Sequence, residues 1–191
     1  MALTIETAEQ IAREYYKATP HEPFLEAHSK LVYECAMQLC REEDRTLIGI
    51  AAWLHDIGYS RAGKDDLYKH AHYSINILEE TGIELDDILR DSILNHGREP
   101  KTAEGKVIQV ADKASFFDTC KLKHYYLDHI EELRGNANRS VREIMEDTAS
   151  VFAPEIIEVY RKGYKLIPLA RMSEFSVKVV AENIDYLKER L

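Results

Sequence analysis

The chain has 191 residues, of which 45% are hydrophobic and 31% are charged, and its formal net charge at pH 7 is −9. This composition excludes a disordered or fibrous protein, and the negative charge argues against binding to a nucleic acid duplex, which needs a basic surface. No apolar run reaches the roughly 18 residues of a membrane helix, and the N-terminus lacks the pattern of a secretory signal. We therefore expect a folded cytoplasmic protein with no membrane segment.

The cysteines support the same compartment. Cys35, Cys40 and Cys120 include no Cys-x-x-Cys pair, and an odd count makes a disulfide framework unexpected. A reducing cytoplasm is the simplest interpretation. Cys35 shares an apolar helical face, so we expect it to be a small core residue.

The first predicted elements are two helices separated by prolines. Thr7 and Gln10 resemble a capping box, which predicts a helix that starts there. Pro20 and Pro23 then interrupt the pattern, and a second helix is predicted over about 25–43.

The stretch LIGIAAWL at 47–54 is apolar on all sides, which predicts a central buried helix, with Gly58 as its stop. After a polar loop, the periodicity predicts three more helices, over about 69–81, 86–96 and 103–117. Gly82 and Gly97 follow the first two of these helices, as C-terminal caps often do.

Residues 118–191 also have helical periodicity, with a capping box at Ser140 and Glu143. A last amphipathic helix is predicted over about 173–191, with one apolar stripe made of Val180, Ile184, Leu187 and Leu191. This stripe fits the core better than a homodimer seam, which stays open. No strand alternation, repeat or linker is present. We predict a single all-α helical domain over 1–191, with a core at about 25–117 and additional packed helices at 118–191.

Six ionisable residues fall on the apolar faces or at the ends of these predicted helices: His28, His55, Asp56, His70, His96 and Asp112. A single inward histidine is more often a hydrogen-bonded core residue than a ligand. Burying four imidazoles and two carboxylates in one small domain is costly unless they are paired or bind metal. These donors suit Fe, Mn, Zn or Ni.

The order His, His-Asp, His, His, Asp resembles the extended pattern of the HD-domain metal-dependent phosphohydrolases. The segments EAHSKLVYECAMQLC, AAWLHDIG, HAHYSINILEETGI and GKVIQVADKAS resemble the helices that carry the family's ligands, over about 25–117. The His-Asp pair alone is a weak signal, whereas six ligands on the expected helices are a strong one.

The resemblance implies an HD-type helical bundle with one or two divalent metal ions, which could be Fe, Mn, Ni, Zn or Mg. It implies that His28, His55, Asp56 and Asp112 hold the first metal and that Asp56 bridges to a second one. His55 and Asp56 are then the catalytic centre.

The second metal would be held by His70 and His96. His72 competes with His70 for this role, and we prefer His70 because its spacing to Leu78 fits the family's helix. The other histidines, His21, His124 and His129, have no motif context and are expected to be structural or exposed.

The implied reaction is hydrolysis of a phosphate ester or anhydride in a nucleotide or another small metabolite, with metal-activated water as the nucleophile. Cations near the ligands are then expected to bind phosphate oxygens; the candidates are Arg61, Lys64, Lys69, Arg98 and Lys113. Many family members read HDIGK, but this chain has Tyr59 in place of the lysine. Either Arg61 substitutes for that lysine or the substrate differs.

Two other functions compete with hydrolysis. Some HD-fold proteins with the same six ligands hold two irons and use oxygen to cleave C–C or C–P bonds. A non-catalytic metal- or nucleotide-binding regulatory module is the third hypothesis, and residues 118–191 could give it a lid or a dimer interface. The intact ligand set argues against the module, and we favour the hydrolase over the oxygenase.

Overall fold

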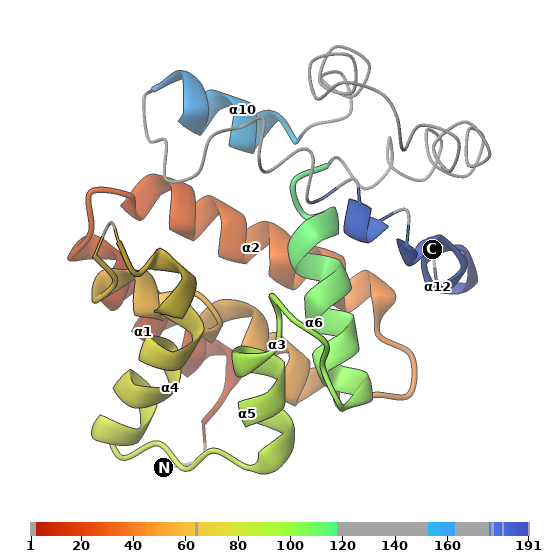
Figure 1. Cartoon of the computed structure of the whole chain (residues 1–191), viewed down its shortest axis with the longest axis horizontal. Coiled ribbons are helices and arrows are strands. Elements are labelled where there is room, and N and C mark those ends of the chain that lie inside the picture. The colour runs from red at the N-terminus through yellow and green to blue at the C-terminus, as the bar shows by residue number, and fades with distance from the viewer. Residues whose placement is uncertain are drawn as a thin grey trace.

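The structure is a computed structural model that describes residues 3–63, 65–117, 153–162, 176, 178–180 and 182–190. Every regular element in these ranges is helical, which confirms the predicted all-α fold (Figure 1). The α-helices are α1 (Ile5–Lys17), α2 (Glu22–Leu39), α3 (Arg45–Leu54), α4 (His70–Glu80), α5 (Asp87–Leu94), α6 (Ala103–Ala114), α10 (Pro154–Arg161) and α12 (Ile184–Arg190). Two short 3₁₀-helices, η1 (Ile57–Ser60) and η2 (Leu67–Lys69), lie between α3 and α4.

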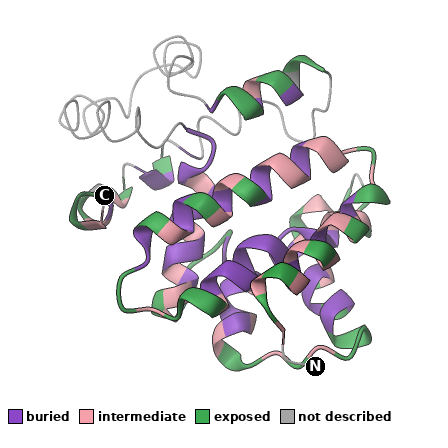
Figure 2. Ribbon diagram, turned by 180° about the vertical axis from the view of Figure 1, so that it is seen from behind, coloured by how far each residue is buried: buried purple, intermediate pink, exposed green. Residues whose placement is uncertain are grey.

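Helix α3 lies at the centre of the helical bundle, as its uniformly apolar sequence predicts. It packs against α1, α2, α5 and α6, and every residue from Ile48 to Leu54 is buried. Buried residues gather where the helices face one another, while exposed residues lie on their outer sides (Figure 2). Helix α2 packs along both α3 and α6, so the elements that carry the six candidate ligands meet around one interior.

The N-terminal helices begin earlier than predicted. The cap of α1 is Thr4, whose side chain accepts a hydrogen bond from the Thr7 backbone N–H, so the prediction of a cap at Thr7 was wrong. Pro23 lies in the first turn of α2 rather than before it, because proline lacks the N–H that is unpaired at that position in any case. Cys35 is buried in this helix, as predicted.

Two helix ends also differ from the prediction. Helix α3 stops at Leu54, and Gly58 lies inside η1 instead of acting as the stop of α3. Helix α5 ends at Leu94 with Asn95 as its cap, so His96 lies just beyond the helix. Gly82 has φ +76° after α4, which is the left-handed conformation expected of a helix-terminating glycine.

The predicted helix over 173–191 is interrupted by a turn at Asn183. The side chain of Asn183 donates a hydrogen bond to the Val179 carbonyl, which competes with the helical backbone. Val180 and Leu187 are buried, as the apolar stripe predicts. The capping box at Ser140 and the positions Lys64, Cys120, His124 and His129 lie outside the described residues, as do the Ile184 side chain and Leu191.

None of the helices in the described ranges is long and apolar enough to cross a membrane.

Candidate metal centre

The six candidate ligands come from five segments that meet at one point. His28 lies on α2 and Asp112 on α6, while His55 and Asp56 directly follow α3. His70 is the first residue of α4, and His96 is the second residue after α5. Five of the six are buried and His70 is half-buried.

The turn that carries His55 and Asp56 is fixed by its packing on α4. Ser74 is fully buried; its hydroxyl donates to the His55 carbonyl at 2.8 Å and accepts from the Gly58 N–H at 2.9 Å. A side-chain carbon at Gly58 would lie 1.9 Å from the His70 carbonyl oxygen. The sequence therefore needs glycine at position 58, because the His-Asp turn and the start of α4 are in direct backbone contact.

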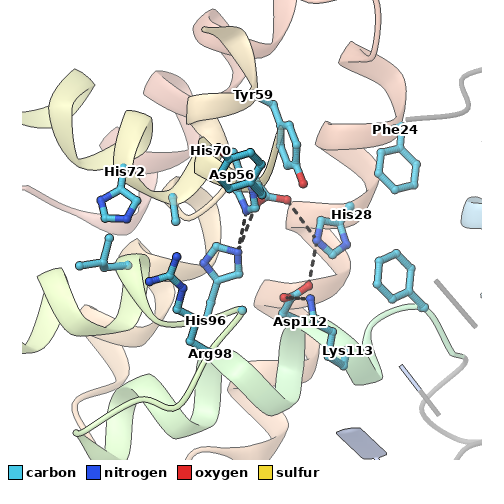
Figure 3. A pocket seen from close by; sticks show the side chains of 15 residues that line it. Phe24, His28, Asp56, Tyr59, His70, His72, His96, Arg98, Asp112 and Lys113 are labelled. Atoms are coloured by element: carbon cyan, nitrogen blue, oxygen red, sulfur yellow. Dashed lines mark hydrogen bonds and ion pairs between the residues drawn. The ribbon is translucent and has the colours of Figure 1, made fainter. Parts of the chain in front are cut away.

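Asp56 lies between two groups of histidines. Its Oδ2 atom is 3.4 Å from the Nε2 atoms of both His28 and His55. Its Oδ1 atom faces the other pair, at 3.3 Å from His70 Nε2 and 3.6 Å from His96 Nε2. Asp112 joins the first group, with Oδ1 at 3.3 Å from His28 Nε2. Figure 3 shows His28, His70 and His96 gathered around Asp56, with Asp112 beside His28.

The four imidazoles are oriented alike by their second ring nitrogens. The Nδ1 atoms of His55, His70 and His96 face the carbonyl oxygens three residues earlier, at 2.9, 2.6 and 2.7 Å. His28 Nδ1 is 3.3 Å from the Ser115 hydroxyl, which itself donates to the Asp112 carbonyl. In each case the hydrogen-bond geometry places a proton on Nδ1 and leaves Nε2 facing the cluster. Metal-bound histidines are held in this way.

In this arrangement the Nε2 atoms of neighbouring histidines face one another. The Nε2 atoms of His70 and His96 are 3.0 Å apart, and those of His28 and His55 are 3.4 Å apart. Burial, together with the nearby His55 and His70, lowers the pKa of His96 to about 3, so this imidazole is neutral at pH 7. Burial also lowers the pKa of His55. Lone pairs that face each other in a buried site are costly unless a proton or a cation lies between them.

The carboxylates add negative charge to these acceptors. Burial alone would raise the pKa of Asp112, but Lys113 and His28 hold it well below its ordinary value. Burial likewise opposes ionisation of Asp56, and the surrounding histidines outweigh it, so its pKa is lowered. Two ionised carboxylates and the Nε2 acceptors form a donor set that fits transition metals. His28, His55 and Asp112, and also His55, Asp56 and His96, have ligand atoms within 4.8 Å of one another.

A pocket of about 350 Å³ opens onto this cluster. Its walls include His28, Asp56, His70, His96 and Asp112 among the candidate ligands, together with aromatic side chains from several elements. The aromatic residues are Phe24, Tyr59, Tyr68 and Phe116. The volume is near the lower end for ligand pockets, which suits a small metabolite.

The predicted phosphate-binding cations divide into two groups. Lys113 and Arg98 line the pocket, and the Lys113 ammonium also contacts Asp112. Arg61 instead forms a two-point ion pair with Glu80 at 2.9 and 2.6 Å, and it is not among the pocket-lining residues in the described part of the chain. Lys69 is also absent from that lining; its ammonium is 5.4 Å from the Tyr68 ring centre. Arg61 is thus paired with Glu80 in this structure, and its replacement of the lysine of HDIGK stays a hypothesis.

The structure also distinguishes His70 from His72 as the candidate ligand. His70 faces Asp56, whereas His72 is exposed at the edge of the pocket and points away from the cluster (Figure 3). Sequence reasoning missed Ser74 and Ser115, which orient the cluster through backbone carbonyls. Ser115 lies three residues after Asp112. Its position one helical turn after a candidate ligand was the available indication that it contacts the cluster.

A family model of the HD domain matches residues 25–116. The chain contains an HD domain. The matched span includes all six candidate ligands and ends one residue before the predicted core boundary at 117, and HD domains are typical of metal-dependent phosphohydrolases. Searches of curated proteins and of solved structures found no match.

Proposed function

We propose that this HD domain is a binuclear metal-dependent phosphohydrolase that acts on a phosphate ester or anhydride of a nucleotide or another small metabolite. The observation that carries the proposal is the placement of the two carboxylate oxygens of Asp56. Oδ2 faces His28 and His55, and Oδ1 faces His70 and His96. A carboxylate with each oxygen directed at a separate histidine pair is suited to bridge two ions.

Each part of the chain has a defined task in this proposal. His28, His55 and Asp112 would hold the first ion, His70 and His96 would hold the second, and Asp56 would contribute to both. When bound, two divalent ions polarise a phosphoryl oxygen and lower the pKa of water, so that hydroxide is available near neutral pH. No nucleophilic side chain is then required.

The remaining residues bind and orient the substrate. Lys113 and Arg98 are placed at the pocket wall, where their charges can meet phosphate oxygens. Phe24 and Phe116 both stack with His28, with ring centres at 5.9 and 4.9 Å from its ring, and both line the pocket. These apolar rings exclude water from the cluster and strengthen electrostatic interactions inside it.

The experiment is a panel of phosphate monoesters, diesters and anhydrides assayed with manganese-, magnesium-, nickel- and zinc-loaded protein without oxygen. We expect hydrolysis of at least one compound by the wild type and a loss of at least 100-fold in Asp56→Asn. Asp65→Asn, which changes an exposed carboxylate outside the pocket, is the matched control and should keep wild-type activity. Metal-replete wild type that is inactive on the whole panel would contradict the proposal. Protein that purifies with two irons and consumes oxygen would favour the oxygenase instead.

A further inference from the structure

Tyr68 is an aromatic residue that lines the pocket but lies in solvent. It is 68% exposed, and in the described part of the chain it is the one large hydrophobic residue that is exposed. The other aromatic residues of the pocket differ from it, since Phe24 and Phe116 are buried and Tyr59 is half-buried. Burial of an aromatic ring stabilises a fold, and Tyr68 supplies little of this stabilisation. Its position at the pocket points to contact with a ligand.

The exposure of the lining residues gives the pocket a floor and a mouth. His96 and Asp112 are 3% and 2% exposed, so the cluster of candidate ligands forms the floor. Arg98 and Lys113 lie beside His96 and Asp112 (Figure 3). The exposed Tyr68 lies at the mouth. A substrate whose phosphate is bound at the floor would therefore extend its organic part toward Tyr68.

The backbone on either side of Tyr68 is fixed by residues of α4. The Leu67 carbonyl oxygen is 2.6 Å from His70 Nδ1, and the Asp66 carboxylate accepts a hydrogen bond from the Tyr73 hydroxyl at 2.6 Å. The base of the Tyr68 side chain is thus held in a fixed relation to a candidate metal ligand. A tyrosine has two side-chain torsions, so on a fixed backbone its ring loses little entropy when a ligand stacks on it.

The Tyr68 ring has a face on which a flat group can stack. The Lys69 ammonium lies over the ring, 5.4 Å from its centre. No aromatic side chain of the described residues is stacked on it. A planar ligand group can therefore occupy the face opposite Lys69.

The composition of the pocket lining favours a flat aromatic group over a sugar. Among the described residues, the lining includes four aromatic side chains with Ala71 and Leu94, but no serine, threonine, asparagine or glutamine. Side chains of those four types are neutral hydrogen-bonding partners of the kind that many hydroxyl groups require. Stacking on an aromatic ring needs only a π face, which every nucleobase has.

We propose that Tyr68 is a specificity-determining residue, whose ring stacks on the base of a nucleotide while the phosphate is bound at the metal cluster. This inference rests on the proposed phosphohydrolase function. It narrows the substrate from small phosphorylated metabolites in general to those that carry a flat aromatic base. Arg98 and Lys113 meet the phosphate, and Tyr68 selects the organic part.

Two probes that differ in the base test this proposal: the 5′-methylenephosphonate analogues of AMP and of ribose 5-phosphate. A methylene group replaces the ester oxygen in both, which prevents cleavage. Manganese-loaded wild type, Tyr68→Ala and Tyr68→Phe would be titrated with each analogue by calorimetry, and metal content would be measured on the same samples.

We expect the wild type to bind the AMP analogue at least about tenfold more tightly than the ribose analogue, which is the usual effect of one base–aromatic stack. Tyr68→Ala should lose this preference by weakening the binding of the AMP analogue alone. Tyr68→Phe keeps the ring and is the matched control, so it should match the wild type for both analogues. Metal content should be unchanged, because Tyr68 is exposed.

The contrary outcomes are separable. Equal wild-type affinities for the two analogues, no binding of the AMP analogue, or an unchanged preference in Tyr68→Ala would overturn the inference and leave the hydrolase proposal standing. Equal weakening of both analogues or loss of metal in Tyr68→Ala would also overturn it, because the ring would then support the cluster. So would a Tyr68→Phe variant as weak as Tyr68→Ala. Metal-loaded wild type that binds neither analogue and hydrolyses no compound of the phosphate panel would overturn both proposals together.

Discussion

The Nε2 atoms of His70 and His96 lie 3.0 Å apart, although the Nδ1 atom of each ring faces a backbone carbonyl. Two ring nitrogens that both present lone pairs at this distance repel each other, and a divalent ion between them removes that repulsion. We expect manganese at about 100 times its dissociation constant to raise the melting temperature by about 5–10 °C over chelator-treated protein. Calcium prefers oxygen ligands and should raise it much less. Equal melting temperatures with and without manganese would contradict a metal role for this pair.

Ser74 joins the His-Asp turn to α4, and its removal should weaken the site from a distance. Ser74→Ala leaves the buried His55 carbonyl and Gly58 N–H without their partner, which should cost about 2 kcal/mol of unfolding free energy. Metal affinity should fall about 10–100-fold, as it does when partners that orient ligands are lost. Chemical denaturation and metal titration measure the two effects.

The control for Ser74 is Ser60→Ala, because Ser60 also donates to a backbone carbonyl, that of Ile57, on the adjacent 3₁₀-helix. It should change metal affinity little. Equal metal affinities for Ser74→Ala and the wild type would show that the turn holds its geometry without this bond.

Asp91 connects the segments that carry His96 and Asp112. Its carboxylate accepts from the backbone N–H groups of Lys101 and Thr102 and from the side chains of Thr102 and Asn95. Burial opposes ionisation, but the Asn95 and Thr102 hydrogen bonds outweigh it and lower the pKa of Asp91 below its ordinary value of 3.8.

Because the folded-state pKa of Asp91 is lowered, its stabilising contribution is complete above the unfolded value and is lost as the pH falls toward the folded value. Asp91→Asn should therefore reduce the unfolding free energy at pH 7 by about 1–3 kcal/mol. The difference from wild type should shrink as the pH falls below about 4. Denaturant midpoints at several pH values test this; a difference that is constant with pH would show that the ionised form is not the stabilising one.

The placement of the candidate ligands was predictable where it depends on helical periodicity. His28 and Asp112 each lie on the apolar face of a long helix, so the 3.6-residue repeat is sufficient to turn them inward. His55 and Asp56 follow a helix that is apolar all round, and they end in the interior for that reason. His70 was preferred over His72 by its spacing on the same helix, and the structure brings His70 to Asp56.

The features that the sequence did not reveal depend on contacts between distant segments. Arg61 pairs with Glu80, 19 residues away, because the path of the loop after η1 decides which carboxylate it meets. The Ser74 hydroxyl donates a hydrogen bond to a backbone carbonyl of another segment. Any small polar residue at position 74 would fit the helical periodicity equally well, so the sequence does not predict this contact. Thr4 and Thr7 are both acceptable helix caps, and only the backbone path selects Thr4.

The stacking of Tyr59 on His70 was equally hidden. The sequence has a tyrosine at the position where the resembling family has a lysine. This substitution is visible in the sequence, but the position of the tyrosine ring is not. The structure shows that the position is adjacent to the cluster and lines the pocket.

The account rests on two metal ions that share Asp56, and metal content per chain tests this most directly. Elemental analysis would be made on protein purified without chelator, for the wild type, His96→Ala and His72→Ala. We predict about two ions in the wild type and in His72→Ala, because His72 is exposed and points away from the cluster, and about one in His96→Ala. No metal in the wild type, with none taken up on soaking, would contradict the account, as would an unchanged metal content in His96→Ala.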